Sequence, residues 1–264
     1  MRGWLRKIFL TLLAIGVIVV LVLALQKEKQ LTLNVPLIEL EIQDGMALLT
    51  KEELLGHLKF VRLYQENMKV EDLDIEVVEK FVRGLNEVEN ADVYKLIGDN
   101  WHIRAKIRRP IARIIPDGQD GFYMDNRGRL MAIPPGYNAH VVTFTGLSEF
   151  KTGEVLKLDL INNDSLITNT KLGDIYRISN YVCNNAFYTS QIVQIHYKSS
   201  DGFVLIPRVG EHEIIFGGAP SEESVLGKFD KLTTFYEEVI PFEGWDKYSS
   251  INLKFEKQIV AKKK

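Results

Sequence analysis

The chain has 264 residues, of which 46% are hydrophobic and 26% are charged, a composition typical of globular proteins. This length allows one or two compact domains. The first 29 residues carry a net charge of +4, and because the whole chain carries −2, the remainder carries −6. A mildly acidic main part argues against broad binding to nucleic acid, which requires a basic surface. The single cysteine, Cys183, excludes an intramolecular disulfide, and we interpret it as a small buried apolar residue.

An apolar segment without charges extends from residue 8 to residue 26. As a helix, about 18 of these residues span roughly 27 Å, close to the hydrocarbon thickness of a bilayer. We therefore predict a transmembrane helix over 8–26. A cleaved signal peptide is the alternative, because residues 22–24 resemble a cleavage site, but the apolar core is longer than in typical signal peptides. The basic residues of 1–7 predict, by the positive-inside rule, a cytoplasmic tail and an exported main part.

Residues 31–113 have the pattern of a strand, two helices and two further strands. Thr50 and Glu53 have the spacing of a capping box and predict the start of the first helix. In the last run the apolar and polar side chains alternate, so the apolar set is predicted to pack on the helices and His102 to lie on the solvated face. The predicted elements are a strand at 38–42, a helix from Thr50, a helix over 78–85, and strands at 88–93 and 101–107.

A row of basic residues accompanies the last of these strands. One interpretation is a solvated sheet face, and the other is a contact surface for an acidic segment of a partner protein. The second interpretation makes Arg104, Lys106 and Arg108 candidate secondary contact residues. The full row is Arg104, Lys106, Arg108, Arg109 and Arg113.

Residues 114–261 again mix helices and strands, so the expected fold class is α+β. Turn residues at 126–128 join two short strands into a hairpin, and tight turns join three strands between 192 and 216 into a meander. Ser221 is predicted to cap a helix that runs to about Val239. The predicted elements are a hairpin of 122–124 and 130–133, a strand at 141–146, a helix over 174–188, strands at 192–197, 203–209 and 212–216, the helix from Ser221, and terminal strands at 250–255 and 258–261.

The order of elements in 31–113 resembles a POTRA domain, a small α/β module that docks other chains. The run 106–113, which ends in Pro-Ile-Ala-Arg, resembles the end of the POTRA domain in the FtsQ/DivIB family of bacterial cell division proteins. Residues 122–128 and 141–146 resemble the hairpin and the strand that come next in that family. The resemblance extends in order over nearly the whole chain.

The resemblance implies both a domain order and a function. The expected order is a cytoplasmic tail at 1–7, a transmembrane helix over 8–26, a POTRA-like domain at 31–113, an FtsQ-type β domain at 114–261 with a C-terminal edge strand, and a basic tail at 262–264. The protein is then expected to be a single-pass inner-membrane protein of type II, with its C-terminal domains in the periplasm. It is expected to act at the division site as a scaffold of the divisome that supports septum formation, and not as an enzyme.

In this family, the small coiled-coil division proteins FtsB and FtsL bind by adding a strand to the exposed edge near the C-terminus of the β domain. An edge strand has unpaired backbone groups that such a partner satisfies, so the same mode suits this sequence. Phe255 matches an aromatic contact residue of the family, but it is equally consistent with a core position. The family's contact arginine has no counterpart that we can place, and Gln191 and Gln194 are the nearest polar residues. The residues expected to bind the partner are Lys254, Phe255, Lys257, Gln258, Ile259 and Val260.

Motifs of catalysis are missing from the sequence. It contains no HExxH, GxSxG, GxxxxGK or CxxC, and the five histidines lack ligand spacing. Asp159 and Asp164 have the side chains of a carboxylate pair, but 162–164 is more simply interpreted as a turn. We therefore expect no cofactor, no metal and no small-molecule substrate. Two alternatives stay open: another POTRA-bearing docking protein of envelope assembly, and a membrane-anchored periplasmic enzyme.

Overall fold

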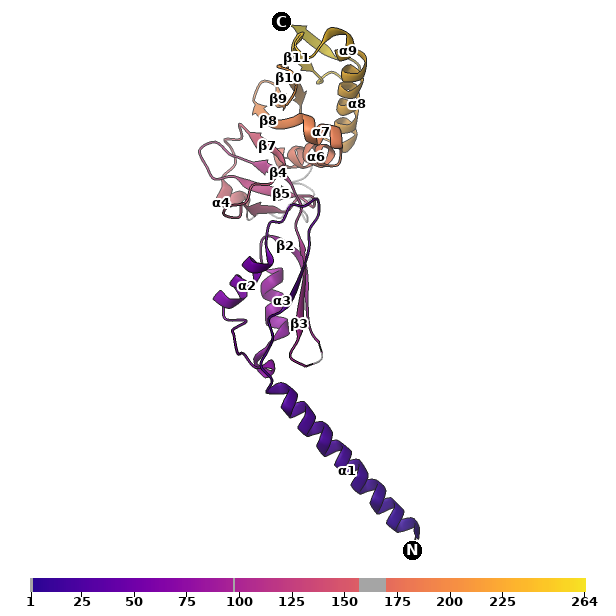
Figure 1. Cartoon of the computed structure of the whole chain (residues 1–264). Coiled ribbons are helices and arrows are strands. Elements are labelled where there is room, and N and C mark those ends of the chain that lie inside the picture. The colour runs from indigo at the N-terminus through magenta and orange to yellow at the C-terminus, as the bar shows by residue number, and fades with distance from the viewer. Residues whose placement is uncertain (1, 97, 157–169) are drawn as a thin grey trace. The chain divides into compact units, whose positions relative to one another are not determined.

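The computed structural model describes residues 2–96, 98–156 and 170–264 (Figure 1). The chain divides into two compact units, Met1–Ile107 and Arg108–Lys264. Each unit has its own β-sheet, with three strands in the first and nine in the second.

The first unit begins with one continuous helix, α1 (Arg2–Lys29), whose described large apolar side chains are exposed. Crossing a bilayer requires about 20 consecutive, predominantly apolar residues. Among the described residues no helix combines the length and the apolar character that a membrane crossing needs. This finding makes the prediction of a transmembrane helix over 8–26 wrong, and the expected fold class is corrected on this point.

The rest of the first unit is a three-stranded sheet with two α-helices. The middle strand β3 pairs in parallel with β1 and antiparallel with β2, so β1 and β2 are the edges. The order strand, helix, helix, strand, strand is the predicted one. The elements are β1 (Leu37–Glu41), α2 (Lys51–Phe60), the short 3-10 helix η1 (Val70–Asp72), α3 (Ile75–Arg83), β2 (Val88–Lys95) and β3 (Trp101–Ile107).

Local sequence signals explain where the helices of this unit begin. The Thr50 hydroxyl accepts a hydrogen bond from the Glu53 backbone N–H at 3.2 Å, and the Glu53 carboxylate accepts one from the Thr50 N–H at 2.8 Å. This reciprocal pair is the predicted capping box, and it holds the pKa of Glu53 below its usual range, chiefly through the Thr50 backbone hydrogen bond. Asp74 caps α3 in the same manner, accepting from the Val77 N–H at 3.1 Å.

The core of this unit lies under the apolar face of β3. Trp101, Ile103, Ala105 and Ile107 are all buried, as their alternation predicts. His102 on the opposite face is only 8% exposed, so its predicted solvation is wrong. The neighbouring strands cover it: the Tyr94 hydroxyl lies 2.5 Å from Nδ1, and a Glu39 carboxylate oxygen lies 3.6 Å from Nε2.

The second unit contains a nine-stranded mixed sheet in the order β12-β11-β10-β9-β8-β7-β4-β5-β6. The predicted hairpin and the predicted meander are both present, as the antiparallel pairs β5–β6, β8–β9 and β9–β10. The pairs β4–β7, β7–β8 and β10–β11 are parallel. The strands are β4 (Pro110–Ile114), β5 (Phe122–Asp125), β6 (Leu130–Ala132), β7 (Val142–Thr145), β8 (Ile192–Lys198), β9 (Gly202–Pro207), β10 (Glu213–Gly217), β11 (Tyr248–Asn252) and β12 (Val260–Lys263).

The core of the second unit lies between this sheet and a group of helices. The side chain of Ser221 caps α8 as predicted, accepting from the Ser224 N–H at 3.1 Å. The helix predicted over 174–188 is two helices, because Asn185 starts a new one by capping the Tyr188 N–H. The described helices are α4 (Thr152–Val155), α6 (Lys171–Cys183), α7 (Ala186–Gln191), α8 (Glu222–Glu238) and α9 (Ile240–Glu243).

One apolar cluster joins these helices to the sheet. Phe229 of α8 is fully buried, and its ring lies 5.1 Å from that of Phe216 on β10 and 4.6 Å from that of Tyr188 on α7. The Tyr188 hydroxyl donates a hydrogen bond to the Phe229 carbonyl at 3.1 Å, and burial raises the pKa of this phenol. The helix-bearing face of the sheet is therefore closed by a packed core, and the two edge strands of the sheet are β12 and β6.

Candidate functional site

The C-terminal strand β12 forms one edge of the nine-stranded sheet (Figure 1). It pairs antiparallel with β11, with Ala261 opposite Ile251 and Val260 opposite Asn252. In the described part of the chain, no strand pairs with its other side. Such an edge presents a row of unpaired backbone N–H and C=O groups, which is a template for another strand.

The register of β12 shows which backbone groups are available. The Lys264 N–H donates to the Lys247 carbonyl at 3.1 Å, and the Lys262 carbonyl accepts from the Ser249 hydroxyl at 3.1 Å, so both residues direct backbone groups toward β11. Backbone groups of successive residues in a strand alternate in direction. Ala261 and Lys263 therefore direct their N–H and C=O groups away from β11, where an added strand would lie.

Side chains on β12 and before it divide between the core and solvent. Ile259 and Ala261 are partly buried and pack against the apolar cluster. Val260 is 45% exposed, and Phe255 is 46% exposed in the preceding turn. The exposure of Phe255 shows that it is not a fully buried core residue. An incoming strand thus meets apolar side chains beside the open backbone groups.

The turn between β11 and β12 is held by a lysine of α8. The Lys231 ammonium donates hydrogen bonds to the carbonyl of Leu253 at 3.1 Å and to that of Phe255 at 2.5 Å. Burial lowers the pKa of Lys231, and the nearby Glu256 carboxylate partly opposes this effect. Helix α8 is anchored in the core, so Lys231 fixes the start of the edge segment, which we define as residues 254–264, to the rest of the unit.

Ion pairs hold both ends of the edge segment. At its start, Lys254 pairs with Asp201 in the β8–β9 turn at 3.0 Å, and this hydrogen bond lowers the pKa of the Asp201 carboxyl. At its end, Lys263 lies 3.8 Å from Glu243, and Lys264 pairs with Glu211, whose pKa it lowers. These pairs are exposed, and such pairs contribute little to stability individually.

Two further lysines give the edge its charge. Lys257 and Lys262 are exposed, and within the described residues neither has an ion-pair partner. Gln258, between them in the chain, is exposed as well. Glu256, which is exposed beside Lys257, offsets one of these charges, so the three residues carry a net charge of +1, which favours an acidic partner segment.

The candidate secondary contact residues are engaged within the protein. Arg104 pairs with Glu39 at 3.2 Å, and Lys106 pairs with Glu89 at 3.0 Å. Each of these ion pairs combines one positive and one negative charge, so it offers little net charge to a partner. Arg108 pairs with Asp125 at 2.8 Å. In the same row, Arg109 donates to Asn184 at 3.2 Å and Arg113 donates to Asn138 at 2.7 Å.

Other titratable groups do not converge on a reactive centre in the described residues. No group of three metal-ligating side chains occurs there. His196 makes a hydrogen bond with the Thr145 hydroxyl at 2.9 Å, and buried His212 contacts the Tyr236 hydroxyl at 3.1 Å. The carboxylates Asp159 and Asp164 lie outside the described residues.

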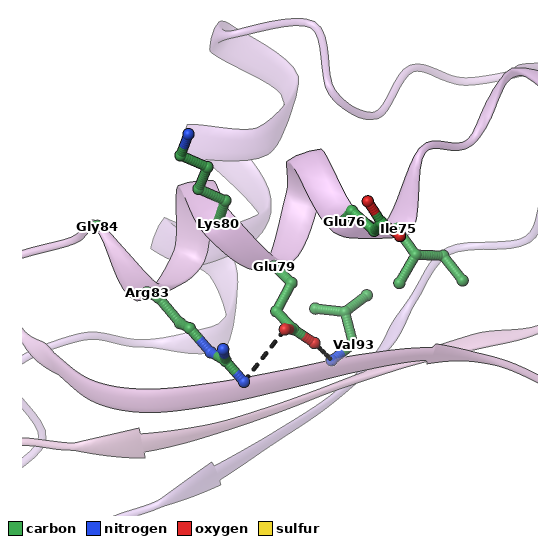
Figure 2. A pocket seen from close by; sticks show the side chains of 7 residues that line it. All are labelled: Ile75, Glu76, Glu79, Lys80, Arg83, Gly84 and Val93. Carbon is green, nitrogen blue, oxygen red and sulfur yellow. Dashed lines mark hydrogen bonds and ion pairs between the residues drawn. The ribbon is translucent and has the colours of Figure 1, made fainter.

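An open groove of the first unit lies between α3 and β2 (Figure 2). The carboxylate of Glu79 and the guanidinium of Arg83 approach to 3.1 Å and turn toward the strand. The two side chains bind each other and the β2 backbone, so their polar groups are already engaged within the protein and are not available to a ligand in the groove. The lining residues are Ile75, Glu76, Glu79, Lys80, Arg83, Gly84 and Val93.

The sequence match coincides with the unit that carries the edge. Residues 109–262, more than half of the chain, match the family described as FtsQ/DivIB, C-terminal related. The chain belongs to this family. The matched residues begin just before β4 and end within β12, so the match covers nearly the whole second unit. Membership in this family supports a role in cell division. No curated protein matches the chain.

The structure also shows a site residue that sequence reasoning missed. Lys231 lies beside Leu232 on the predicted helix, and nothing in the apolar periodicity marks it as a ligand of two distant carbonyls. The two glutamines named in place of the family's arginine are both engaged: Gln191 donates to the Val209 carbonyl at 3.0 Å, and Gln194 donates to the Thr145 hydroxyl at 3.0 Å.

Proposed function

We propose that this chain is a scaffold of the division machinery that binds a small coiled-coil division protein, FtsB-like or FtsL-like, by strand addition at β12. The observation that carries the proposal is the open edge itself. Ala261 and Lys263 direct backbone groups outward, on a strand whose residues 260–262 lie within the family match. The partner then contributes an extended segment whose main chain supplies affinity and whose side chains supply register.

The partner-binding residues of this proposal are those near the open edge. Phe255 and Val260 supply exposed apolar contacts, and Lys257 and Lys262 supply charge. Ile259 contributes through its partial burial, which fixes the orientation of the strand. Lys254 and Gln258 complete the set. A basic edge with two exposed apolar side chains fits a partner strand that combines acidic and apolar residues.

The first unit has a docking role in the same proposal. Its order of strand, helix, helix, strand and strand supports a POTRA-like domain within the predicted range 31–113. This domain ends with β3, because β4 belongs to the nine-stranded sheet, and the FtsQ-type β domain then begins at Arg108 instead of at residue 114. The paired state of Arg104, Lys106 and Arg108 makes them subordinate to the β12 edge as partner contacts. The protein acts as a binding component at the division site, in association with the cell envelope, and catalyses no reaction.

The test is affinity capture of tagged full-length chain from gently crosslinked cells, compared with an Ala261→Pro variant. Proline removes the outward N–H of residue 261 and cannot pair with an added strand. Ala261→Ser is the matched control, because it keeps the backbone donor. We expect coiled-coil division proteins to be recovered with the wild type and with Ala261→Ser, and to be lost with Ala261→Pro.

Two results of this capture would oppose the proposal in different ways. Absence of every division protein from the wild-type sample would reject a scaffold role. Equal recovery with all three chains would retain the scaffold role but reject β12 as the contact. A Phe255→Ala chain then measures how much the Phe255 side chain contributes to the free energy of partner binding. A roughly tenfold loss of affinity corresponds to a contribution of about 1.4 kcal/mol.

A further inference from the structure

The free edge of the first unit differs in kind from the β12 edge. Strand β2 pairs with β3 on one side only. On its other side, the Ala91 carbonyl accepts a hydrogen bond from Arg83 Nε at 2.7 Å, and the Val93 N–H donates one to Glu79 Oε2 at 3.0 Å. Figure 2 shows Glu79 and Arg83 reaching from α3 down to the strand. These are two of the backbone groups that a neighbouring strand would otherwise bind.

The two side chains also hold each other in place. Glu79 Oε1 lies 3.1 Å from an Arg83 terminal nitrogen, one helical turn apart, and that nitrogen lies 3.3 Å from Asp92 Oδ1. Helix α3 is fixed beneath them because Val78 and Val82 are buried in the core. The pair therefore forms a charged bridge between α3 and β2 that is positioned by packing.

We propose that Glu79 and Arg83 form a clamp that closes the β2 edge to strand addition. The clamp substitutes side-chain groups for the backbone of an adjacent strand, so an incoming strand must first displace two charge-assisted hydrogen bonds. Natural sheets protect free edges by covering or charging them, and here one ion pair does both. The inference is independent of partner binding at β12 and concerns a different unit.

The strand that the clamp excludes is β2 of a second copy. Antiparallel self-pairing centred on Asp92 places Ala91 opposite Val93 of the other copy. The carbonyl of the first and the N–H of the second then exchange hydrogen bonds across the two-fold axis. Asp92 meets its own copy in a non-hydrogen-bonded position, where Cα atoms are about 4.5 Å apart.

That position provides a direct assay. In a Cys183→Ser, Asp92→Cys chain, self-pairing brings the two new thiols within disulfide distance, which requires Cα atoms about 4.4–6.8 Å apart. The second substitution removes the contact of Arg83 with Asp92 equally from every chain compared, and it leaves the two hydrogen bonds of the clamp in place. The clamp is released by Glu79→Ala with Arg83→Ala. The matched control is Glu76→Ala with Lys80→Ala, because these exposed groove residues lie on the same helix and their side chains make no hydrogen bond or ion pair in the described part of the chain.

The measurement is the fraction of disulfide-linked dimer under mild oxidation, with the linked peptide identified by mass spectrometry. Losing two competing hydrogen bonds should raise the cross-linked fraction about tenfold to a hundredfold in the released chain. The control chain should match the clamped one. A Glu79→Gln chain should also stay closed, because the amide oxygen still accepts from Val93.

The outcomes that would overturn the clamp are equally definite. A released chain that is folded by circular dichroism and cross-links no more than the control chain rejects it. Should the double substitution unfold the unit, the single Glu79→Ala and Arg83→Ala chains replace it. A folded single variant without any increase then rejects the clamp.

Discussion

Replacing Lys231 with methionine should loosen the edge strand and leave the rest of the second unit intact. The substitution keeps the aliphatic stem but removes the ammonium that binds the carbonyls of Leu253 and Phe255. A hydrogen bond to a charged group contributes about 1.5–3 kcal/mol, and the carbonyl of exposed Phe255 regains water when the lysine is removed, which offsets part of the loss. We therefore expect the edge segment to lose about 1–2 kcal/mol of local stability.

Hydrogen exchange measures this loss residue by residue. The amides of Val260 and Lys262 point toward β11 and are protected only while β12 is paired. A local loss of about 1.4 kcal/mol should speed their exchange about tenfold. Amides at the centre of the sheet, such as that of Leu205 on β9, should exchange at the wild-type rate.

A neighbouring lysine supplies the control for this experiment. Lys228 lies on the same helix and donates to the Gly218 carbonyl at 2.6 Å, and not to a carbonyl of the β11–β12 turn. Lys228→Met should therefore leave Val260 and Lys262 exchange unchanged. The reasoning fails if Lys231→Met leaves both amides as protected as before, or if Lys228→Met exposes them to the same extent.

Two further predictions concern the core and the response to pH. Phe229→Ala should lower the free energy of unfolding by about 3–5 kcal/mol in urea titration, whereas Leu226→Ala, on an exposed position of the same helix, should change it by less than about 0.5 kcal/mol. Burial lowers the pKa of His212, although the Trp245 backbone and Asp246 oppose this and Lys264 reinforces it. Because the folded state binds this proton less readily than the unfolded state, stability should fall as pH drops through about 6.5 toward the lower folded pKa. His212→Gln should remove that part of the pH dependence, and an unchanged profile would exclude the assignment.

Much of the secondary structure could be predicted because its causes are local. The capping pair Thr50 and Glu53, the cap at Ser221 and the alternation of 101–107 each concern residues that are close in sequence, and each is present in the structure. The apolar stripe of α8 likewise predicted its buried face. Local patterns of this kind determine which side of an element is buried.

The features that escaped prediction depend on partners far away in the chain. His102 is buried because β1 and β2 flank it, and sequence alternation alone does not reveal the neighbouring strands. Lys231 binds carbonyls more than 20 residues away. The parallel pairing of β10 with β11 joins strands that are separated by two helices, α8 and α9. The membrane-crossing prediction relied on composition over 8–26, and the described helix does not satisfy it.

The continuous hydrogen-bonded ladder from β12 to β6 has a mechanical consequence. Inter-strand hydrogen bonds lie perpendicular to antiparallel strands, so tension along an added strand loads all of its bonds at once, in shear. Tension across the strand instead opens the bonds one after another, like a zipper. A partner attached at β12 and pulled along the strand axis is therefore held far more firmly than one pulled sideways, and the direction of force decides how long the joint survives.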